Sequence, residues 1–257
     1  SREDLLAFYR AFRDDLAKDP RSTFASTAPY ISLQIYHHAS VRLPAVRPLS
    51  LYTFPAAYTG RRESDVLVSK RNILLWDLAP LLQLFAKINA QPWQFIGADD
   101  LYRQGLHSWQ DWADLRAAVY FPYDWLQTMT FYDWLAMALP TFVPDSPFYG
   151  YAWGTNSQDA WKVALPENDT PAVPYPYHYG DWLDLEGRAH WWSLTDFQVL
   201  PGLARFSSVG DLLSQLASRE ALHELSGQLR QAHAERLVNA APFWRADGLT
   251  CLPLRVR

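Results

Sequence analysis

The sequence predicts an α/β fold, with a mostly parallel sheet flanked by helices and preceded by a segment of helical and extended chain. Three observations support this fold class. Short apolar runs that suit buried strands alternate with longer amphipathic stretches. Residues 117–145 show the patterns of strand, polar loop, helix and strand in succession. Aromatic residues make up 15% and apolar residues 49% of the 257-residue chain, which excludes a disordered protein and indicates a sizeable core.

The N-terminal part of the chain is expected to be helical first and extended afterwards. Residues 4–18 place apolar side chains at helical spacing with charged residues between them, and Asp19 and Pro20 end this amphipathic helix. Residues 22–36 mix short apolar pieces with polar residues, and 42–55 contain three prolines. An extended linker or hinge is therefore expected there.

Two strand patterns and a helix pattern follow this linker. Residues 66–68 are expected to form the first buried strand, and 73–88 the helix after it, interrupted at Pro80. Residues 93–96 are the next strand candidate, and the aromatic stretch 102–112 is expected to be partly helical. This alternation of strands and helices favours an α/β architecture.

The next stretch contains a complete βαβ unit. Small, β-branched and aromatic residues at 117–121 suit a buried strand. Thr128 or Thr130 can cap a helix whose apolar residues recur every three or four positions, and Pro140 closes it. Residues 141–143 then suit a second strand. Because ligands with phosphates bind where the carboxyl ends of parallel strands face helix N-termini, this unit predicts a ligand site.

The C-terminal part combines an irregular segment with a last strand and helices. Residues 144–176 are rich in proline, glycine, asparagine and serine, which is typical of surface chain. This segment is either a functional lid or partner-binding loop, or an ordered insertion packed by its own aromatic residues. Residues 203–206 suit a last strand, and leucines between 212 and 237 predict one or two helices, with a break at Ser218.

Charge and cysteine content limit the possible functions. The chain has 23 Lys and Arg against 27 Asp and Glu, a net charge of −4, which gives no general electrostatic reason for a nucleic-acid surface. Cys251 is the only cysteine, which rules out an intrachain disulfide and a thiolate zinc cluster. No apolar run approaches about 18 residues, so no membrane segment is expected in this chain. A start at Ser1 suggests a trimmed product, from which a targeting segment or anchor could have been removed.

A basic turn directly after the first predicted strand is the first candidate binding element. Ser69, Lys70, Arg71 and Asn72 lie there, where helix-terminal amides and cationic side chains can hold a pyrophosphate. Neither G-x-G-x-x-G nor G-x-x-x-x-G-K-[ST] accompanies this turn. The alternative is a solvated basic turn without a ligand.

Polar residues around the start of the βαβ helix form the second candidate element. Gln127, Thr128 and Thr130 offer amide and hydroxyl groups that can bind phosphate oxygens. Asp133, one turn later, can accept hydrogen bonds from ribose hydroxyls. The structural alternative is that threonine caps the helix and the carboxylate stabilises the helix dipole.

Histidine and tryptophan residues give further candidates. His37 and His38 are adjacent and point apart, so no metal site is expected from them. His190, Trp191 and Trp192 can stack on a sugar ring or fill the core, and core packing is the favoured interpretation. No G-x-S-x-G motif is present to anchor a nucleophilic hydrolase.

Taken in this order, several segments resemble the C-terminal half of glycosyltransferases with the two-domain GT-B architecture. YFPYDWLQTMTFYDWLAMALPTFVPD is similar to the strand, loop and helix start at which these proteins bind a nucleotide sugar, and DVLVSKRN to the opening strand of their donor domain. HWWSLTDFQVLPGLARFSSVGDLLSQLASREALHELSGQLRQAHAERLVNAAPFW is similar to the strand and long helix that close this domain. TFASTAPYISLQIYHHASVRLPAVRPLSLYT resembles the crossing segment between the two halves. The resemblance covers about residues 20–245.

The resemblance implies a domain organisation. A remnant of the first domain plus the crossing linker would occupy residues 1–58. A Rossmann-like donor-binding domain would occupy 59–245, with an irregular insertion at 144–192, and 246–257 would be a C-terminal tail.

The resemblance also implies a function: binding a nucleotide sugar and transferring the sugar to an acceptor, without a metal or other cofactor. The donor-binding residues would be Lys70, Arg71, Tyr123, Gln127, Thr128, Thr130 and Asp133. No catalytic residue is assigned, because the general base of inverting members belongs to the first domain, and a partner chain could supply that half. The alternative is a non-catalytic subunit with a structural or assembly role, whose surface rich in Trp and Pro contacts a protein partner. The location would be the Golgi or another secretory lumen for a trimmed membrane-anchored transferase, and intracellular otherwise.

Overall fold

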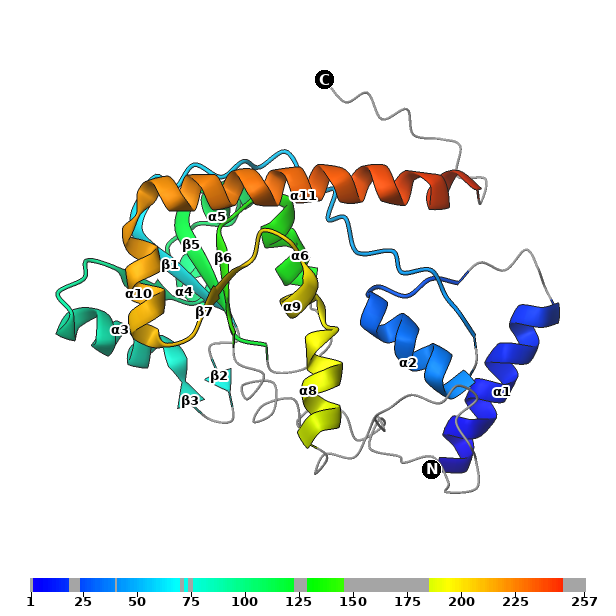
Figure 1. The fold of residues 1–257 in the computed structure, drawn as a ribbon. Helices are drawn as coiled ribbons and strands as arrows, with labels where there is room; N and C mark the ends of the chain where they lie inside the picture. The colour runs from blue at the N-terminus through cyan, green and yellow to red at the C-terminus, as the bar shows by residue number, and fades with distance from the viewer. Residues whose placement is uncertain are drawn as a thin grey trace.

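The fold is built around one parallel sheet of five strands in the order β4-β1-β5-β6-β7 (Figure 1). A computed structural model describes residues 2–18, 24–39, 41–69, 72–73, 76–122, 129–145 and 185–246. The strands are β1 (Arg62–Ser69), β4 (Gln94–Ile96), β5 (Leu115–Tyr120), β6 (Thr141–Pro144) and β7 (Ala204–Phe206). All four neighbouring pairs are parallel. The predicted α/β, Rossmann-like fold class is therefore confirmed.

The order of the strands reverses direction at β1. From β1 the chain moves outward to the edge strand β4, and it then returns past β1 to β5, β6 and β7. The connections from β5 to β6 and from β6 to β7 therefore lead away from β1, on the side opposite β4. Such a reversal leaves a crevice at the carboxyl ends of the two strands that flank it, here β1 and β5.

The predicted βαβ unit is confirmed. β5 and β6 are parallel neighbours, with Ala118 paired to Thr141, and α6 (Met129–Ala136) connects them. The helix ends before Pro140, and Ala138 adopts a positive φ of 56° in the turn that leads to β6. The other predicted strands are also present, each within a few residues of its expected bounds.

Helices cover both faces of the sheet, as strand alternation requires. Val66 and Val68 of β1 point into a core formed with α3 (Leu78–Ile88) and α10 (Val209–Ala217). Leu67, between them, points into the larger opposite core. That core also contains residues of α4 (Ala98–Arg103), α5 (Trp109–Ala113), α6, α8 (Leu185–Ser193) and α9 (Asp196–Val199).

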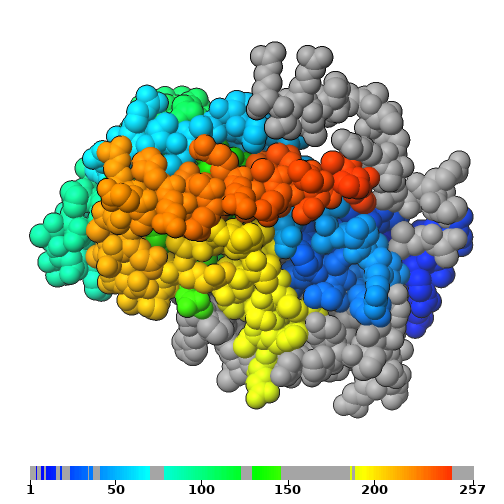
Figure 2. All heavy atoms as spheres, turned by 45° about the horizontal axis from the view of Figure 1, so that its top comes forward, coloured from blue at the N-terminus to red at the C-terminus, as the bar shows by residue number. Residues whose placement is uncertain are grey.

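The last helix, α11 (Arg219–Ala246), has 28 residues and extends beyond the sheet towards α2 (Figure 1). Figure 2 shows it as a continuous band between the linker, in cyan, and the chain around α8, in yellow. Its start confirms the predicted break at Ser218, which ends α10 with an extended backbone. The Ser218 hydroxyl accepts a hydrogen bond from the amide of Ala221, so this serine also caps the new helix.

The prediction of a helix from residue 73 is wrong at its start. Asn72–Ile73 form β2 and Trp76–Asp77 form β3, an antiparallel pair, and α3 begins only at Leu78. Pro80 does not interrupt this helix. It lies in the first turn, where a backbone amide has no partner within the helix and its loss costs little.

The N-terminal segment contains α1 (Arg2–Lys18), as predicted, and a second helix that the sequence did not predict, α2 (Pro29–Ala39). Pro29 is the first residue of α2, a position that suits proline. The stretch from 41 to 61 is extended apart from a turn at 51–55, and the single bridge Ser26 to Ala45 attaches it to the chain before α2. Among the described residues, no helix has the length and apolar character needed to cross a membrane.

Candidate functional site

β1 and β5, the strands that precede the two elements singled out by the sequence, are neighbours that end at the same edge of the sheet. Ser69 ends β1 and is paired with Tyr120, which ends β5. The basic turn therefore leaves the sheet beside the loop that leads to α6. Five of the predicted site residues lie outside the described residues, namely Lys70, Arg71, Tyr123, Gln127 and Thr128. The topology thus places their segments at one edge, and their roles stay predictions.

The start of α6 faces this edge, because α6 follows β5 directly. The helix begins at Met129, so Thr130 lies within its first turn and is not its cap. Thr130 is partly buried and Met129 is exposed. The backbone amides of this turn have no acceptor within the helix, which suits an anion.

Asp133 lies one turn into α6, where it binds the linker. Its side chain is only 4% exposed, and its carboxylate accepts a hydrogen bond of 2.7 Å from the hydroxyl of Tyr52. This bond, together with burial and the negative charge, raises the pKa of Tyr52 to about 12. The Tyr52 ring itself is 55% exposed. A ligand hydroxyl that binds this carboxylate would therefore have to share it with Tyr52 or displace Tyr52.

A buried ion pair joins the linker to α9 close to α6. Arg47 donates from Nε and Nη2 to the two carboxylate oxygens of Asp196, at 2.9 and 3.0 Å, and Tyr132 donates to the same carboxylate at 2.7 Å. Asp196 is fully buried. Burial and the adjacent carboxylate raise the pKa of Tyr132 well above its ordinary value, so it remains a neutral donor. No spacing or motif in the sequence indicates this contact, which joins residues 149 positions apart.

Arg236 of α11 interacts electrostatically with this ion pair, and His233 lies next to Arg236. Arg236 donates to Nδ1 of the buried His233 at 3.3 Å, and the Phe54 ring of the linker lies against the imidazole. Burial and the positive charge of Arg236 lower the pKa of His233 to about 4. Because the imidazole stays neutral at pH 7, it contributes no second positive charge to this junction.

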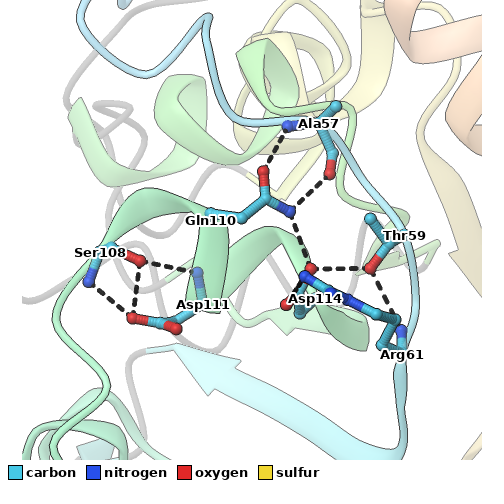
Figure 3. Close-up of polar contacts among 7 residues, drawn as sticks. All are labelled: Ala57, Thr59, Arg61, Ser108, Gln110, Asp111 and Asp114. Atoms are coloured by element: carbon cyan, nitrogen blue, oxygen red, sulfur yellow. Dashed lines mark hydrogen bonds and ion pairs between the residues drawn. The ribbon is translucent and has the colours of Figure 1, made fainter.

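A third contact holds the linker against α5 (Figure 3). The Gln110 amide group bonds both the N–H and the C=O of Ala57, at 3.1 and 3.0 Å. Asp114 accepts hydrogen bonds from Thr59, Gln110 and Arg61. Although burial raises it, these bonds hold the pKa of Asp114 below its ordinary value. The linker is therefore bound to α5, α6 and α9, and the expectation of a hinge applies only if these contacts break.

The described residues give little support to the remaining sequence candidates. Trp191 and Trp192 are 1% and 2% exposed, so both fill the core and neither offers a ring face to a sugar. The favoured core interpretation is thus correct. No group of three or more metal-ligating side chains occurs within the described part of the chain. The side chains of His37 and His38 lie outside it.

A hollow of about 290 Å³ lies on the α10 side of the sheet. It is bounded by β6, β7, α10 and α11, with Ser214, Gln215 and Gln228 among its lining residues. Gln215 also donates to the backbone carbonyl of Arg205 on the edge strand β7. Glu224 is the only charged residue of its lining, so the edge where β1 and β5 end remains the better candidate for an anionic ligand.

Comparison with known proteins finds no matching protein family, no matching curated protein and no matching solved structure. The function must therefore be argued from the topology and the side chains alone. The parallel sheet, its reversal at β1 and the contacts of Asp133 are the observations available for that argument.

Proposed function

We propose that this chain is the donor-binding half of a GT-B-type glycosyltransferase-like protein, which binds a nucleotide sugar and transfers the sugar to an acceptor. The observation that carries the proposal is the reversal of strand order between β1 and β5. Ligands of open parallel sheets bind at this point. Ser69 precedes the basic turn in the sequence and Tyr120 precedes the polar loop, and these two residues are paired where β1 and β5 end.

The chemistry of sugar transfer fits the residue types at this edge. Negative charge grows on the leaving diphosphate as its bond to the sugar breaks, so nearby positive groups stabilise the transition state. Lys70 and Arg71 are proposed for that role, and the amides and hydroxyls from Tyr123 to Thr130 for the phosphate oxygens. Asp133 is proposed for the ribose, in exchange for Tyr52. A general base would come from another domain or chain.

Calorimetric titration with a panel of nucleoside diphosphates and nucleotide sugars tests this proposal. At least one ligand should bind, and the double variant Lys70→Ala/Arg71→Ala should weaken it about tenfold or more, because charged contacts to a diphosphate are lost. A matched double variant, Lys87→Ala/Arg230→Ala, removes two exposed charges from α3 and α11 and should leave the affinity unchanged. Failure of the whole panel to bind at millimolar concentration would refute the donor site.

A non-catalytic subunit with an assembly role is the second candidate, and the surface of α3 favours it. Its inner face packs on the sheet through Ala79, Leu82 and Ala86. Its outer face is also apolar, with the exposed residues Leu81, Leu84, Phe85 and Ile88 at helical spacing. α3 lies at the outer end of the sheet (Figures 1 and 2). An exposed apolar stripe of this kind is typical of a protein contact surface.

A further inference from the structure

Five aromatic rings follow one another from the linker across α5 to α4, with exposed rings at both ends and a buried one between them. We define this aromatic row as Tyr52, Trp109, Trp112, Tyr102 and His107. Successive ring centroids are 5.6, 5.8, 6.1 and 5.6 Å apart. We propose that the aromatic row is a binding surface for an uncharged oligosaccharide.

The ends of the row are open to a ligand, whereas its centre is anchored in the core. Tyr52 and Tyr102 are 55% and 49% exposed, and His107 is exposed as well. Trp109 is half-buried, and Trp112 is buried beneath it in the core. Tyr102 and His107 are stacked, with 17° between their planes, so each ring supports one face of the other. Aromatic faces carry partial negative charge, which attracts the C–H groups of a pyranose ring.

The row is held rigidly before any ligand arrives. Ser108 caps α5 through its hydroxyl, which accepts from the amide of Asp111 at 3.1 Å, and Asp111 accepts from the amide of Ser108 at 2.9 Å. In the sequence, Trp109 and Gln110 both lie between the two members of this capping box. Gln110 binds the linker at Ala57 (Figure 3). Because these contacts fix α5 and the linker together, little side-chain entropy is lost on binding.

The charges around the row favour an uncharged ligand. Asp99 is exposed on α4, Asp100 is partly buried beside it, and Asp111 lies at the start of α5. Against these carboxylates stand Arg103, which pairs with Asp100 at 3.2 Å, and Arg62, which acts on Asp111 and is itself paired with Asp65. The excess of negative charge repels phosphates and acidic polysaccharides. Sugar hydroxyls, in contrast, can both donate to carboxylates and accept from a guanidinium.

The size of the surface argues for a sugar rather than a folded protein. A stable protein interface buries about 800 Å² on each partner. The exposed parts of a few rings fall well below that area, whereas a short oligosaccharide needs only ring faces and adjacent polar groups. The row also begins at Tyr52, whose hydroxyl is bound to Asp133. An oligosaccharide on the row would therefore approach the acid proposed for the donor site, although its binding does not depend on that site.

Titration calorimetry with cellohexaose, maltohexaose, mannohexaose and xylohexaose tests the proposal. We expect at least one of them to bind the intact chain. Tyr102→Ala should weaken that binding about fivefold or more, because a stacking face is lost, whereas Tyr102→Phe keeps the ring and should stay within about twofold. Phe85→Ala, which removes an exposed ring from α3, is the matched control and should change nothing.

The outcomes separate this inference from the proposed function. Oligosaccharide binding that survives Lys70→Ala/Arg71→Ala supports the row even if no nucleotide binds. The inference is overturned if none of the four hexasaccharides binds at millimolar concentration, or if Tyr102→Ala binds as tightly as the wild type. It is also overturned if a polygalacturonate oligomer binds better than all four, because the surrounding carboxylates should repel that polyanion. If Tyr102→Ala changes only the sedimentation behaviour of the chain, the row is instead a protein contact.

Discussion

Arg47 and Asp196 are 149 residues apart in the chain and form a two-point ion pair that fastens the linker to α9. Asp196 has no exposed surface, and Tyr132 adds a third hydrogen bond to its carboxylate. This contact explains how an extended, proline-containing stretch keeps one path over an α/β domain.

Replacement of Asp196 by asparagine should destabilise the protein strongly. The change leaves a largely buried guanidinium without its counter-charge, which costs about 3–5 kcal/mol when one partner of a buried pair is removed. Urea unfolding followed by circular dichroism measures the effect. Arg61→Ala is the control, because that side chain is 67% exposed beside Asp114 and its loss should cost less than about 1 kcal/mol. Equal losses in the two variants would contradict the structure.

Removal of the Tyr52 hydroxyl should also reduce stability. In Tyr52→Phe the buried Asp133 carboxylate loses a donor, and an unsatisfied buried acceptor costs about 1–3 kcal/mol. Tyr102→Phe removes a hydroxyl from another exposed tyrosine and should change the free energy of unfolding by less than about 0.5 kcal/mol. Thermal and urea unfolding of both variants provide the comparison. A neutral Tyr52→Phe would mean that solvent or another group satisfies Asp133.

His233 should make the stability depend on pH in the acidic range. Its native pKa is about 4, below the value of 6.5 for the free side chain, so only the unfolded chain takes up this proton between those limits. The free energy of unfolding therefore falls as the pH falls, by up to about 1.4 kcal/mol per pH unit for one proton. Urea unfolding at pH 7, 6, 5 and 4.5 should show a shallower loss for His233→Gln. Parallel curves would show that burial does not hold the imidazole neutral.

Gly202 and Gly105 offer a test of backbone strain with and without a close contact. Both have positive φ, 81° and 78°. A Cβ at Gly202 would lie 3.1 Å from the backbone nitrogen of Leu229 in α11, whereas a Cβ at Gly105 would meet nothing within 4 Å. Gly105→Ala should cost about 1 kcal/mol, the strain of the left-handed conformation alone. Gly202→Ala should cost clearly more, and equal melting temperatures would contradict the packing of α11.

The outer face of α3 should tolerate charge. Leu84→Glu and Ile88→Glu place carboxylates on exposed positions, so each should change the free energy of unfolding by less than about 0.5 kcal/mol. If the stripe mediates assembly, the same changes should lower the sedimentation coefficient at high protein concentration. Leu82→Glu places a carboxylate on the buried face and should unfold the domain. That result would confirm the orientation of the helix.

Much of the fold could be predicted because its strands and helices follow from patterns that extend over only a few residues. Residues 117–143 contain strand, helix and strand signals within the span of one βαβ unit, and leucine spacing with Ser218 predicted the last two helices. The start of α3 was misplaced because apolar residues at 73–76 fit a helix equally well. α2 was missed because its aromatic and β-branched residues are poor helix formers, so its apolar contacts outweigh local propensity.

The sequence predicted which segments form the candidate site, but not the contacts that their side chains make. Lys70, Arg71 and the loop before α6 follow strand signals, and strand ends in a parallel sheet share one edge. That reasoning could not show that Asp133 would be bound by Tyr52 from the linker, since no spacing rule connects residues 81 positions apart. It also could not tell buried from exposed aromatic residues. Trp191 and Trp192 proved to be core, whereas Tyr52 and Tyr102 are among the exposed aromatic residues.

The sequence by itself determined the class of the fold and most of the succession of strands and helices, and it predicts the edge at which a ligand would bind. Those properties follow from periodicity, which acts over a few residues. Only the tertiary structure decided the order of the strands, the buried pair of Arg47 with Asp196 and the alignment of five rings into one row. Such features depend on which distant segments exclude water together, and burial is a property of the assembled chain rather than of any stretch within it.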